Sequence, residues 1–298
     1  MDDPLKEDFL PQLRAKLGQA GISTWETNLT ETFDKKLCDR VAIVTGAGAG
    51  IGEAAALLFS AHGAKIVAVD WLGERADATV KEIHQAGGAA IAVKADVSLQ
   101  ADVRRIVATT LSAFGKPTIL FNNAGINQEQ RRPLTHIPEE DFDKTVAVNL
   151  KGPFLMMKYV VPHMIEAGGG TIVNTASLAA FDHVSTAGYS ASKAGLVAMT
   201  RVAAAELGIH KIRVNALCPG AIETPLAASQ REGMKARGLP GADELMLKVS
   251  ALKRMGTSLE MAKVALFLAS EDSSYTTGQP FIADGGWNLY AGVEKRPL

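Results

Sequence analysis

Two side chains that can exchange a proton stand four residues apart in the segment Tyr189-Ser190-Ala191-Ser192-Lys193. Residues at i and i+4 share one face of a helix, so a helix here places the Lys193 ammonium beneath the Tyr189 phenol. The pKa of a free tyrosine is about 10, which is too high for a base at neutral pH. A neighbouring cation favours the tyrosinate, so Lys193 is predicted to lower the pKa of Tyr189. The pair predicts general acid/base chemistry, although ordinary helices also contain this spacing.

A glycine-rich segment lies between an apolar run and a helical pattern and follows the pattern T-G-x-x-x-G-x-G. Its residues are Thr45-Gly46-Ala47-Gly48-Ala49-Gly50-Ile51-Gly52. Gly46 permits a sharp turn, while Gly50 and Gly52 remove side chains where the backbone must approach a pyrophosphate. The helix that follows directs free N–H groups and its positive dipole end at that anion. We therefore predict a dinucleotide site that includes Gly48 and Ile51, against the alternative of a tight strand–helix connection.

An acidic residue ends the second apolar run, because Asp70 stands 18 residues after Gly52. A carboxylate there can accept hydrogen bonds from both hydroxyls of an adenosine ribose, and it repels a 2′-phosphate. Neither Val69 nor Trp71 supplies a cation, and Arg75 is expected on the helix face. Asp70 and Trp71 therefore predict a site for NAD rather than NADP, although a helix-capping aspartate is a common alternative.

Short apolar runs alternate with helical patterns from residue 40 onward and would position these side chains. The runs cover residues 41–44, 65–69, 89–93, 118–121, 171–173, 212–217 and 281–283, and helical patterns include 53–62, 74–86 and 192–207. Most runs are continuous rather than alternating, which is typical of strands covered on both faces. We therefore predict an α/β fold with one doubly wound, Rossmann-type domain and a parallel seven-stranded sheet flanked by helices.

Composition excludes several other classes of protein. Lys and Arg number 31 against 32 Asp and Glu, a net charge of −1 that offers no field for nucleic acid. Cys38 and Cys218 lack metal-type or disulfide-scaffold spacing, and each is expected to be a small, mostly buried residue. No apolar run reaches the roughly 18 residues of a membrane span, and residues 1–4 do not resemble a secretory signal. A cytoplasmic protein without a metal site is expected.

These motifs together resemble the short-chain dehydrogenase/reductase family, over residues 40–287, or 248 of 298. The resemblance rests on the glycine segment, the Tyr189 and Lys193 pair, and further motifs in the family's order. These are Asp96-Val97, Asn122-Asn123-Ala124-Gly125, Asn149, Ser177, Pro219-Gly220, Thr224 and Asp284-Gly285-Gly286-Trp287.

The resemblance implies a catalytic role for four residues. Tyr189 would exchange a proton with the substrate oxygen, and Ser177 would orient that oxygen. Lys193 would hold the nicotinamide ribose and lower the Tyr189 pKa, and Asn149 would support a water-linked proton relay. The implied cofactor contacts are Asp96 and Val97 at the adenine, Asn123 near the adenosine-side ribose, Gly125 in the adjoining turn, and Ile222 and Thr224 at the carboxamide. Ala124, Pro219 and Gly220 are also implied to bind the cofactor.

One departure from the family pattern concerns the substrate side. Ser177 and Tyr189 are 12 residues apart, one fewer than in many members, and Ala180 stands where glycine is frequent. The loop with Phe181, Asp182 and His183 is therefore expected to have a shape particular to this chain. The resemblance also implies a substrate lid at about residues 221–251.

The expected organisation is an N-terminal extension at residues 1–39, a helical arm, followed by a catalytic domain at residues 40–298. The predicted function is NAD-dependent interconversion of a secondary alcohol and its ketone, with a sugar, polyol, steroid-like, cyclic or small hydroxy compound as the substrate. The alternatives are a 3-oxoacyl-thioester reductase and a non-catalytic NAD-binding sensor or scaffold. The resemblance also implies a homotetramer, a dimer of dimers.

Overall fold

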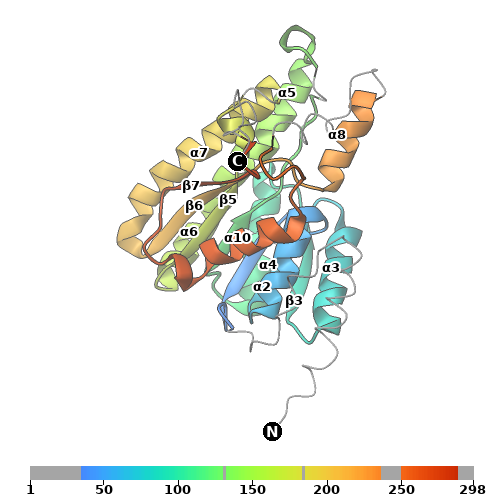
Figure 1. Ribbon diagram of the computed structural model, residues 1–298. Coiled ribbons are helices and arrows are strands. Elements are labelled where there is room, and N and C mark those ends of the chain that lie inside the picture. The colour runs from blue at the N-terminus through green and yellow to red at the C-terminus, as the bar shows by residue number, and fades with distance from the viewer. Residues whose placement is uncertain (1–34, 130–131, 183–184, 236–249, 288–298) are drawn as a thin grey trace, which may run out of the picture.

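A seven-stranded parallel sheet in the order β3-β2-β1-β4-β5-β6-β7 runs through the molecule, with helices on both faces (Figure 1). This computed structural model describes residues 35–129, 132–182, 185–235 and 250–287. Every pair of neighbouring strands is parallel, as expected for strand–helix–strand units. The predicted doubly wound α/β fold is therefore confirmed.

The observed elements match the predicted runs closely. The strands are β1 Val41–Thr45, β2 Lys65–Asp70, β3 Ala90–Lys94, β4 Ile119–Asn122, β5 Gly170–Thr175, β6 Ile212–Pro219 and β7 Pro280–Ala283. The helices are α2 Gly50–Ala61, α3 Gly73–Gln85, α4 Gln100–Phe114, α5 Glu139–Val146, α6 Gly152–Glu166, α7 Ala187–Leu207, α8 Pro225–Lys235 and α10 Ser258–Ala269. Short helical turns lie at Leu134–His136, Ala147–Lys151, Leu178–Ala180, Gly208–His210 and Glu271–Ser273.

Both faces of the sheet are covered by apolar side chains, which explains the continuous apolar runs. Along β1, Ala42 and Val44 pack into a core shared with α2, α3 and α10. Ile43 faces the other way, into a core shared with α4, α6 and α7. Successive strand residues point to opposite faces, so a doubly covered strand needs apolar residues throughout.

The order of the strands reverses beside β1, because the chain leaves β3 at one edge and returns as β4 on the other side of β1. In an open parallel sheet, ligands bind outside the carboxyl ends of the strands at such a point. The glycine segment follows β1, Asn123 follows β4, and Ser177 lies two residues after β5. The topology therefore brings the predicted site residues to one edge.

Most of the predicted N-terminal arm and part of the predicted lid lie outside the described residues. Of residues 1–39, the structure describes 35–39, where Leu37 is fully buried and its N–H bonds to the carbonyl of His62 at 3.0 Å. Cys38 is exposed, so the expectation of burial was wrong for this residue, whereas Cys218 is buried. Cys38 lies in the turn before β1, and its thiol is exposed among the described residues.

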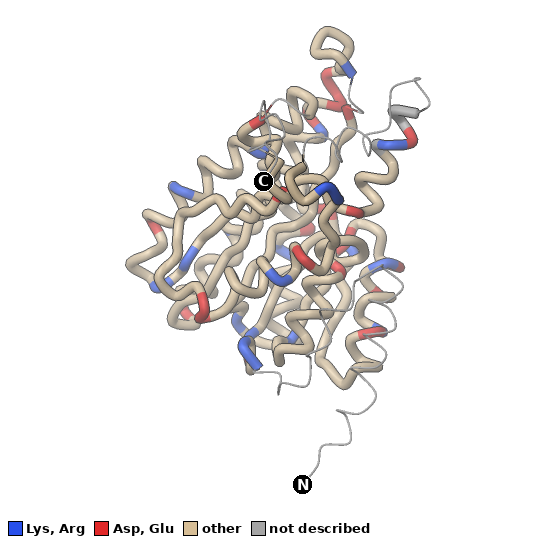
Figure 2. The backbone as a smooth tube through the Cα atoms, in the orientation of Figure 1, with Lys and Arg blue, Asp and Glu red and all other residues tan. Residues whose placement is uncertain are grey.

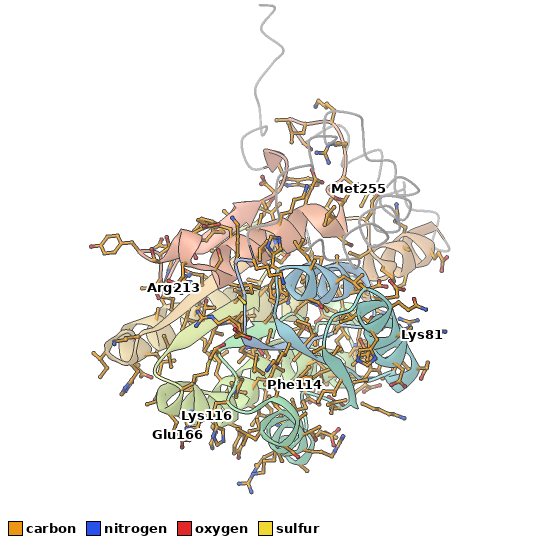
Figure 3. The ribbon with its side chains drawn as sticks, turned by 90° about the horizontal axis from the view of Figure 1, so that it is seen from below. Lys81, Phe114, Lys116, Glu166, Arg213 and Met255 are labelled. Atoms are coloured by element: carbon orange, nitrogen blue, oxygen red, sulfur yellow. The ribbon has the colours of Figure 1, made fainter. Side chains whose placement is uncertain are left out.

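Charged residues of both signs are interspersed along the backbone, as the near-zero net charge suggests (Figure 2). Ion pairs tie segments together away from the carboxyl edge of the sheet. Lys116 before β4 pairs with Glu166 at the end of α6, with Nζ and Oε2 3.4 Å apart, and both are labelled in Figure 3. Arg213 on β6 donates to the carbonyl of Ser270 at 2.8 Å. Within the described residues, no helix is long and apolar enough to cross a bilayer.

Candidate functional site

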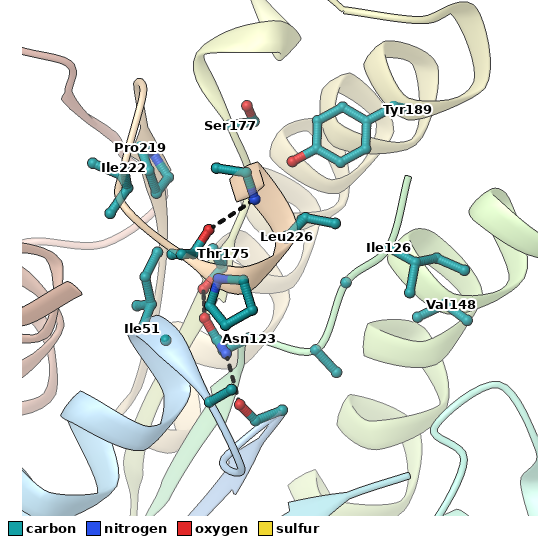
Figure 4. A pocket seen from close by; sticks show the side chains of 18 of the residues that line it. Ile51, Asn123, Ile126, Val148, Thr175, Ser177, Tyr189, Pro219, Ile222 and Leu226 are labelled. Carbon is teal, nitrogen blue, oxygen red and sulfur yellow. Dashed lines mark hydrogen bonds between the residues drawn. The ribbon is translucent and has the colours of Figure 1, made fainter. Parts of the chain in front are cut away.

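A cavity of about 680 Å³ lies at the carboxyl ends of the strands and contains most of the predicted site residues. Figure 4 shows Ser177 and Tyr189 at one end of it and Ile51 at the other. The predicted residues that line it are Gly46, Gly50, Ile51, Asp70, Trp71, Asp96, Val97, Asn123, Ala124, Gly125, Ser177, Tyr189, Lys193, Pro219, Gly220, Ile222 and Thr224. Gly48, Gly52 and Asn149 are not part of the lining.

The glycine segment forms a turn that only small residues allow. Gly46 and Gly50 have positive φ angles of 65° and 61°. A Cβ added at Gly52 would stand 2.0 Å from the Gly46 carbonyl oxygen. The absence of a side chain at Gly52 therefore lets the first turn of α2 pack against the backbone at Gly46. Helix α2 begins at Gly50, with Ala49 as its N-cap. Alanine has no side-chain oxygen for the first free N–H groups of the helix, so they are suited to an anion such as a pyrophosphate.

Asp70 is held in place by two backbone N–H groups. Its Oδ2 accepts from Gly48 and its Oδ1 accepts from Leu72, each at 3.0 Å. Gly48 therefore supports the carboxylate rather than lining the cavity. Arg75, expected only on a helix face, lines the cavity, and a Cβ added at Gly48 would stand 2.5 Å from the Arg75 Cβ. A carboxylate and a guanidinium therefore share this end of the cavity.

Helix α7 begins at Ala187, five residues earlier than the predicted 192, and so carries both Tyr189 and Lys193 in its first turns. Lys193 Nζ lies 5.6 Å from the centroid of the Tyr189 ring and donates to the carbonyl oxygen of Thr175 at 2.7 Å. Thr175 ends β5, and its hydroxyl donates to Asn123 Oδ1 at 3.3 Å. Sequence reasoning missed Thr175, although its place two residues before Ser177 pointed to this edge.

Burial raises the pKa of Tyr189 above its usual value, and the Ser177 hydroxyl opposes this shift more weakly. This direction is opposite to the one that the sequence predicts. Burial is the larger influence, because removal from water disfavours the charged tyrosinate. Burial also lowers the pKa of Lys193 to about 8, with the neighbouring Cys218 acting in the opposite direction. Tyr189, whose side chain reaches the cavity, therefore holds its proton at neutral pH.

Asn149 lies fully buried in a π-helical turn, Ala147–Lys151, between α5 and α6. Its Oδ1 accepts from the N–H of Ile126 at 2.8 Å, and its Nδ2 donates to the carbonyl of Ile126 at 2.9 Å. It also donates to Ser192 Oγ on α7 at 3.3 Å. Single π-turns inside helices are frequent at functional sites. Asn149 thus links the loop after β4, the π-turn and helix α7 through its hydrogen bonds.

Gly125 lies beside both Lys193 and Asn149. A Cβ added there would stand 3.3 Å from Lys193 Nζ and 3.4 Å from Asn149 Oδ1. A larger residue would meet both polar atoms, so glycine keeps the loop after β4 close to Lys193. The position predicted as an adjoining turn therefore also determines the spacing behind the catalytic pair.

The cavity lining also has several apolar side chains that sequence reasoning did not single out as contacts. They are Ile126, Val148, Leu178, Ala179, Leu226, Met255 and Trp287. Leu226 belongs to α8, the described part of the predicted lid, and Thr224 Oγ1 accepts from Ala227 N at 3.2 Å. Residues 236–249 of the predicted lid lie outside the described residues. Within the part of the chain that the structure describes, there is no cluster of side chains suited to a metal ion.

Comparison with known proteins gives matches that span most of the chain. Residues 46–288 match the family described as enoyl-(acyl carrier protein) reductase. The chain is 40% identical over 252 residues to the 3-oxoacyl-[acyl-carrier-protein] reductase FabG of Thermotoga maritima, covering 84% of this chain and 98% of the relative. It is 36% identical to the cyclohexanol dehydrogenase of an Acinetobacter species, covering 87% and 99%. The crystal structure of levodione reductase superposes with a TM-score of 0.82 at 37% identity, covering 85% and 99%.

Proposed function

Because the chain belongs to the short-chain dehydrogenase/reductase family, we propose that it is an NAD-dependent oxidoreductase that interconverts a secondary alcohol and its ketone. The observation that carries the proposal is one cavity that contains Ser177, Tyr189 and Lys193 together with the glycine turn and Asp70. The nicotinamide group supplies hydride chemistry when bound. The uncapped start of α2 fits the pyrophosphate of such a cofactor.

Each catalytic side chain has a distinct part in the proposal. Tyr189 donates its phenolic proton to the carbonyl oxygen during reduction, and its raised pKa means that the phenol carries this proton at neutral pH. In alcohol oxidation the same residue must accept a proton, so oxidation is expected to accelerate as pH rises. Ser177 hydrogen-bonds the same oxygen, and Lys193 holds the ribose hydroxyls. Asn149 keeps the loop at Ile126 in position and supports the proton relay behind Lys193.

The preference for NAD rests on Asp70. Its carboxylate is fixed by Gly48 and Leu72 and lines the cavity, so it can accept from ribose hydroxyls and repel a 2′-phosphate. Arg75 in the same lining would favour the phosphate once that carboxylate is removed. Measurement of kcat/KM with NADH and NADPH tests this, with Asp70→Ser as the variant. A wild-type preference for NADPH, or no change of preference in Asp70→Ser, would contradict the assignment.

An apolar, cyclic substrate is the class that the cavity supports best among those considered. Ile126, Val148, Leu226 and Met255 contribute apolar surface to the cavity that contains Tyr189. Two of the compared proteins are a cyclohexanol dehydrogenase and a levodione reductase, which supports the same class. A panel of cyclic alcohols, steroid alcohols, polyols and hydroxy acids, followed by NADH absorbance, tests it. Turnover of polyols alone would contradict this substrate class.

The alternative of a 3-oxoacyl-thioester reductase is favoured by the 40% identity to FabG of Thermotoga maritima. A 3-oxoacyl thioester in the same panel, with NADH and NADPH, distinguishes it. A non-catalytic NAD-binding sensor would bind NADH without turning over any member of the panel. Activity with cyclic alcohols that is lost in Tyr189→Phe would exclude the sensor.

Assembly as a homotetramer is supported by exposed apolar side chains on two sides of the sheet, and a cytoplasmic location is proposed from the sequence alone. Phe154 on α6 and Val202 on α7 are 48% and 57% exposed. Ile282 on β7, the last strand of the sheet, is 45% exposed, and Phe267 on α10 is 38% exposed. Apolar groups of this kind are covered in closed symmetric assemblies. Light scattering of the full chain should give about four times 31.5 kDa, and a monomeric mass would contradict the proposal.

A further inference from the structure

A hydrogen bond joins the Ser177–Tyr189 loop to the C-terminal turn. The indole Nε1 of Trp287 donates to Asp182 Oδ2 at 2.9 Å, across 105 residues of sequence. Trp287 is 8% exposed and lines the cavity that contains Ser177 and Tyr189. A buried indole N–H requires an acceptor, and a charged acceptor makes the stronger bond. The pair therefore determines where the indole ring stands.

The C-terminal turn that holds Trp287 is itself fixed to the end of the predicted lid. Gly285 and Gly286 have positive φ angles of 65° and 77°, and Gly286 N donates to Asp284 Oδ1 at 2.8 Å. The carbonyl of Gly285 accepts from Ser250 Oγ at 3.1 Å and from Leu252 N at 3.0 Å. Trp287 is thus held by a turn that only glycines form easily.

The loop that holds Asp182 begins at Ser177. Ser177 Oγ accepts from Ala179 N at 3.1 Å, and the carbonyl of Leu178 accepts from Phe181 N at 2.9 Å. These bonds keep the chain in a short turn between Ser177 and Asp182. A displacement of Asp182 is therefore expected to reach Ser177 within this turn, and with it the position of the substrate oxygen. This is the loop that is one residue shorter than the family pattern.

We propose that Trp287 determines substrate specificity by forming an apolar wall at the substrate end of the cavity, and that Asp182 is the positioning residue that holds it there. The ligand class that this wall fits is a ketone or alcohol with an apolar ring beside the reacting carbon. The inference rests on the proposed function for its substrate. The hydrogen bond itself is independent of that function and can be measured separately.

The test compares Asp182→Ala, Asp182→Asn, Trp287→Phe and the Asp182→Ala/Trp287→Phe double variant. Phenylalanine keeps a ring but lacks the N–H, and asparagine keeps an acceptor oxygen. Each of Asp182→Ala and Trp287→Phe should raise KM for cyclohexanone about tenfold, the range of a lost hydrogen bond to a charged group. Asp182→Asn should stay within about threefold of the wild type, and the double variant should match the single ones.

Two controls separate specificity from a general loss of structure. Asp77→Ala, an exposed acidic residue on α3, should leave KM unchanged. The dissociation constant for NADH should stay within about twofold of wild type in the Asp182 and Trp287 variants, since neither residue stands at the Asp70 end. An unchanged KM in Asp182→Ala, single effects that multiply in the double variant, or an equal loss of NADH affinity would each overturn the proposal.

A spectroscopic readout keeps the inference testable if no ketone is turned over. The ¹⁵N-indole resonance of Trp287 is identified by its loss in Trp287→Phe. It should shift clearly in Asp182→Ala and far less in Asp182→Asn, because only the alanine variant lacks an acceptor. An indole resonance that does not move in Asp182→Ala overturns the hydrogen bond and the proposal with it. Absence of turnover with an intact shift overturns the proposed function and the specificity role, while the hydrogen bond stands.

Discussion

Asn149→Ala should destabilise the protein substantially, because the side chain satisfies both backbone groups of one loop residue. Its amide accepts from Ile126 N at 2.8 Å and donates to Ile126 O at 2.9 Å, and it is fully buried. A buried polar group left without its partner costs about 1–3 kcal/mol. The N–H and C=O of Ile126 are two such groups, so their combined cost is about 2–6 kcal/mol. Ile126 is half-buried, so water can bond to these groups in the variant and reduce that cost. We expect a loss of about 2–4 kcal/mol in the free energy of unfolding.

The matched variant is Asn149→Asp, which changes one hydrogen-bonding atom and almost no volume. Its carboxylate can still accept from Ile126 N, but its second oxygen faces the Ile126 carbonyl, and two acceptors repel each other. Asn149→Asp should therefore be destabilised about as much as Asn149→Ala. This similarity distinguishes loss of the paired bonds from loss of packing alone.

Urea denaturation followed by circular dichroism measures both variants, at one fixed protein concentration because assembly also affects stability. A lower midpoint with an unchanged m-value is the expected result for each. A loss below about 0.5 kcal/mol in both variants, the range of an ordinary surface substitution, would refute the assigned role of these bonds.

Two further predictions concern the glycine turn and helix α10. Gly52→Ala should abolish NADH binding in a fluorescence titration, because its Cβ would stand 2.0 Å from the Gly46 carbonyl oxygen. The control variant Gly208→Ala should bind NADH normally, because a Cβ at Gly208 meets nothing within 4 Å. Glu260→Ala should lower the free energy of unfolding by about 1 kcal/mol at pH 7, since Glu260 completes the capping box of α10 and pairs with Arg254. The pKa of Glu260 is lowered from 4.5 to about 2, chiefly by Arg254, so this contribution is complete above pH 4.5 and is lost as pH falls toward 2. Urea titrations from pH 7 to pH 3 should show the difference between wild type and variant shrinking below pH 4.5, and a constant difference would contradict the reasoning.

The sheet could be predicted from sequence because its strands are covered on both faces, which leaves continuous apolar runs. The residues of the cavity could be predicted because their motifs follow strand ends, and parallel strands bring those ends to one edge. The helical pattern was placed from residue 192 although α7 begins at Ala187, because Gly188 in its first turn has a low helix propensity.

Other features depend on contacts that no local pattern contains. The π-turn at Asn149 has no characteristic residue pattern in the sequence, and the Asp182–Trp287 hydrogen bond joins residues 105 positions apart. The pKa of Tyr189 was predicted in the wrong direction because helical spacing places Lys193 near the ring but does not show the burial of the phenol. Long-range packing decides these features, so they require the structure.

The most direct test of the central claim is the turnover of Tyr189→Phe with the best alcohol of the panel, measured by NADH absorbance alongside NADH affinity. Removal of one hydroxyl leaves the ring in place and eliminates only the exchangeable proton. General acid/base catalysis contributes about 10²–10⁴-fold, so kcat should fall at least about 100-fold, while the dissociation constant for NADH stays within about twofold of wild type. Near-normal turnover in this variant would contradict the role of Tyr189 as the general acid/base.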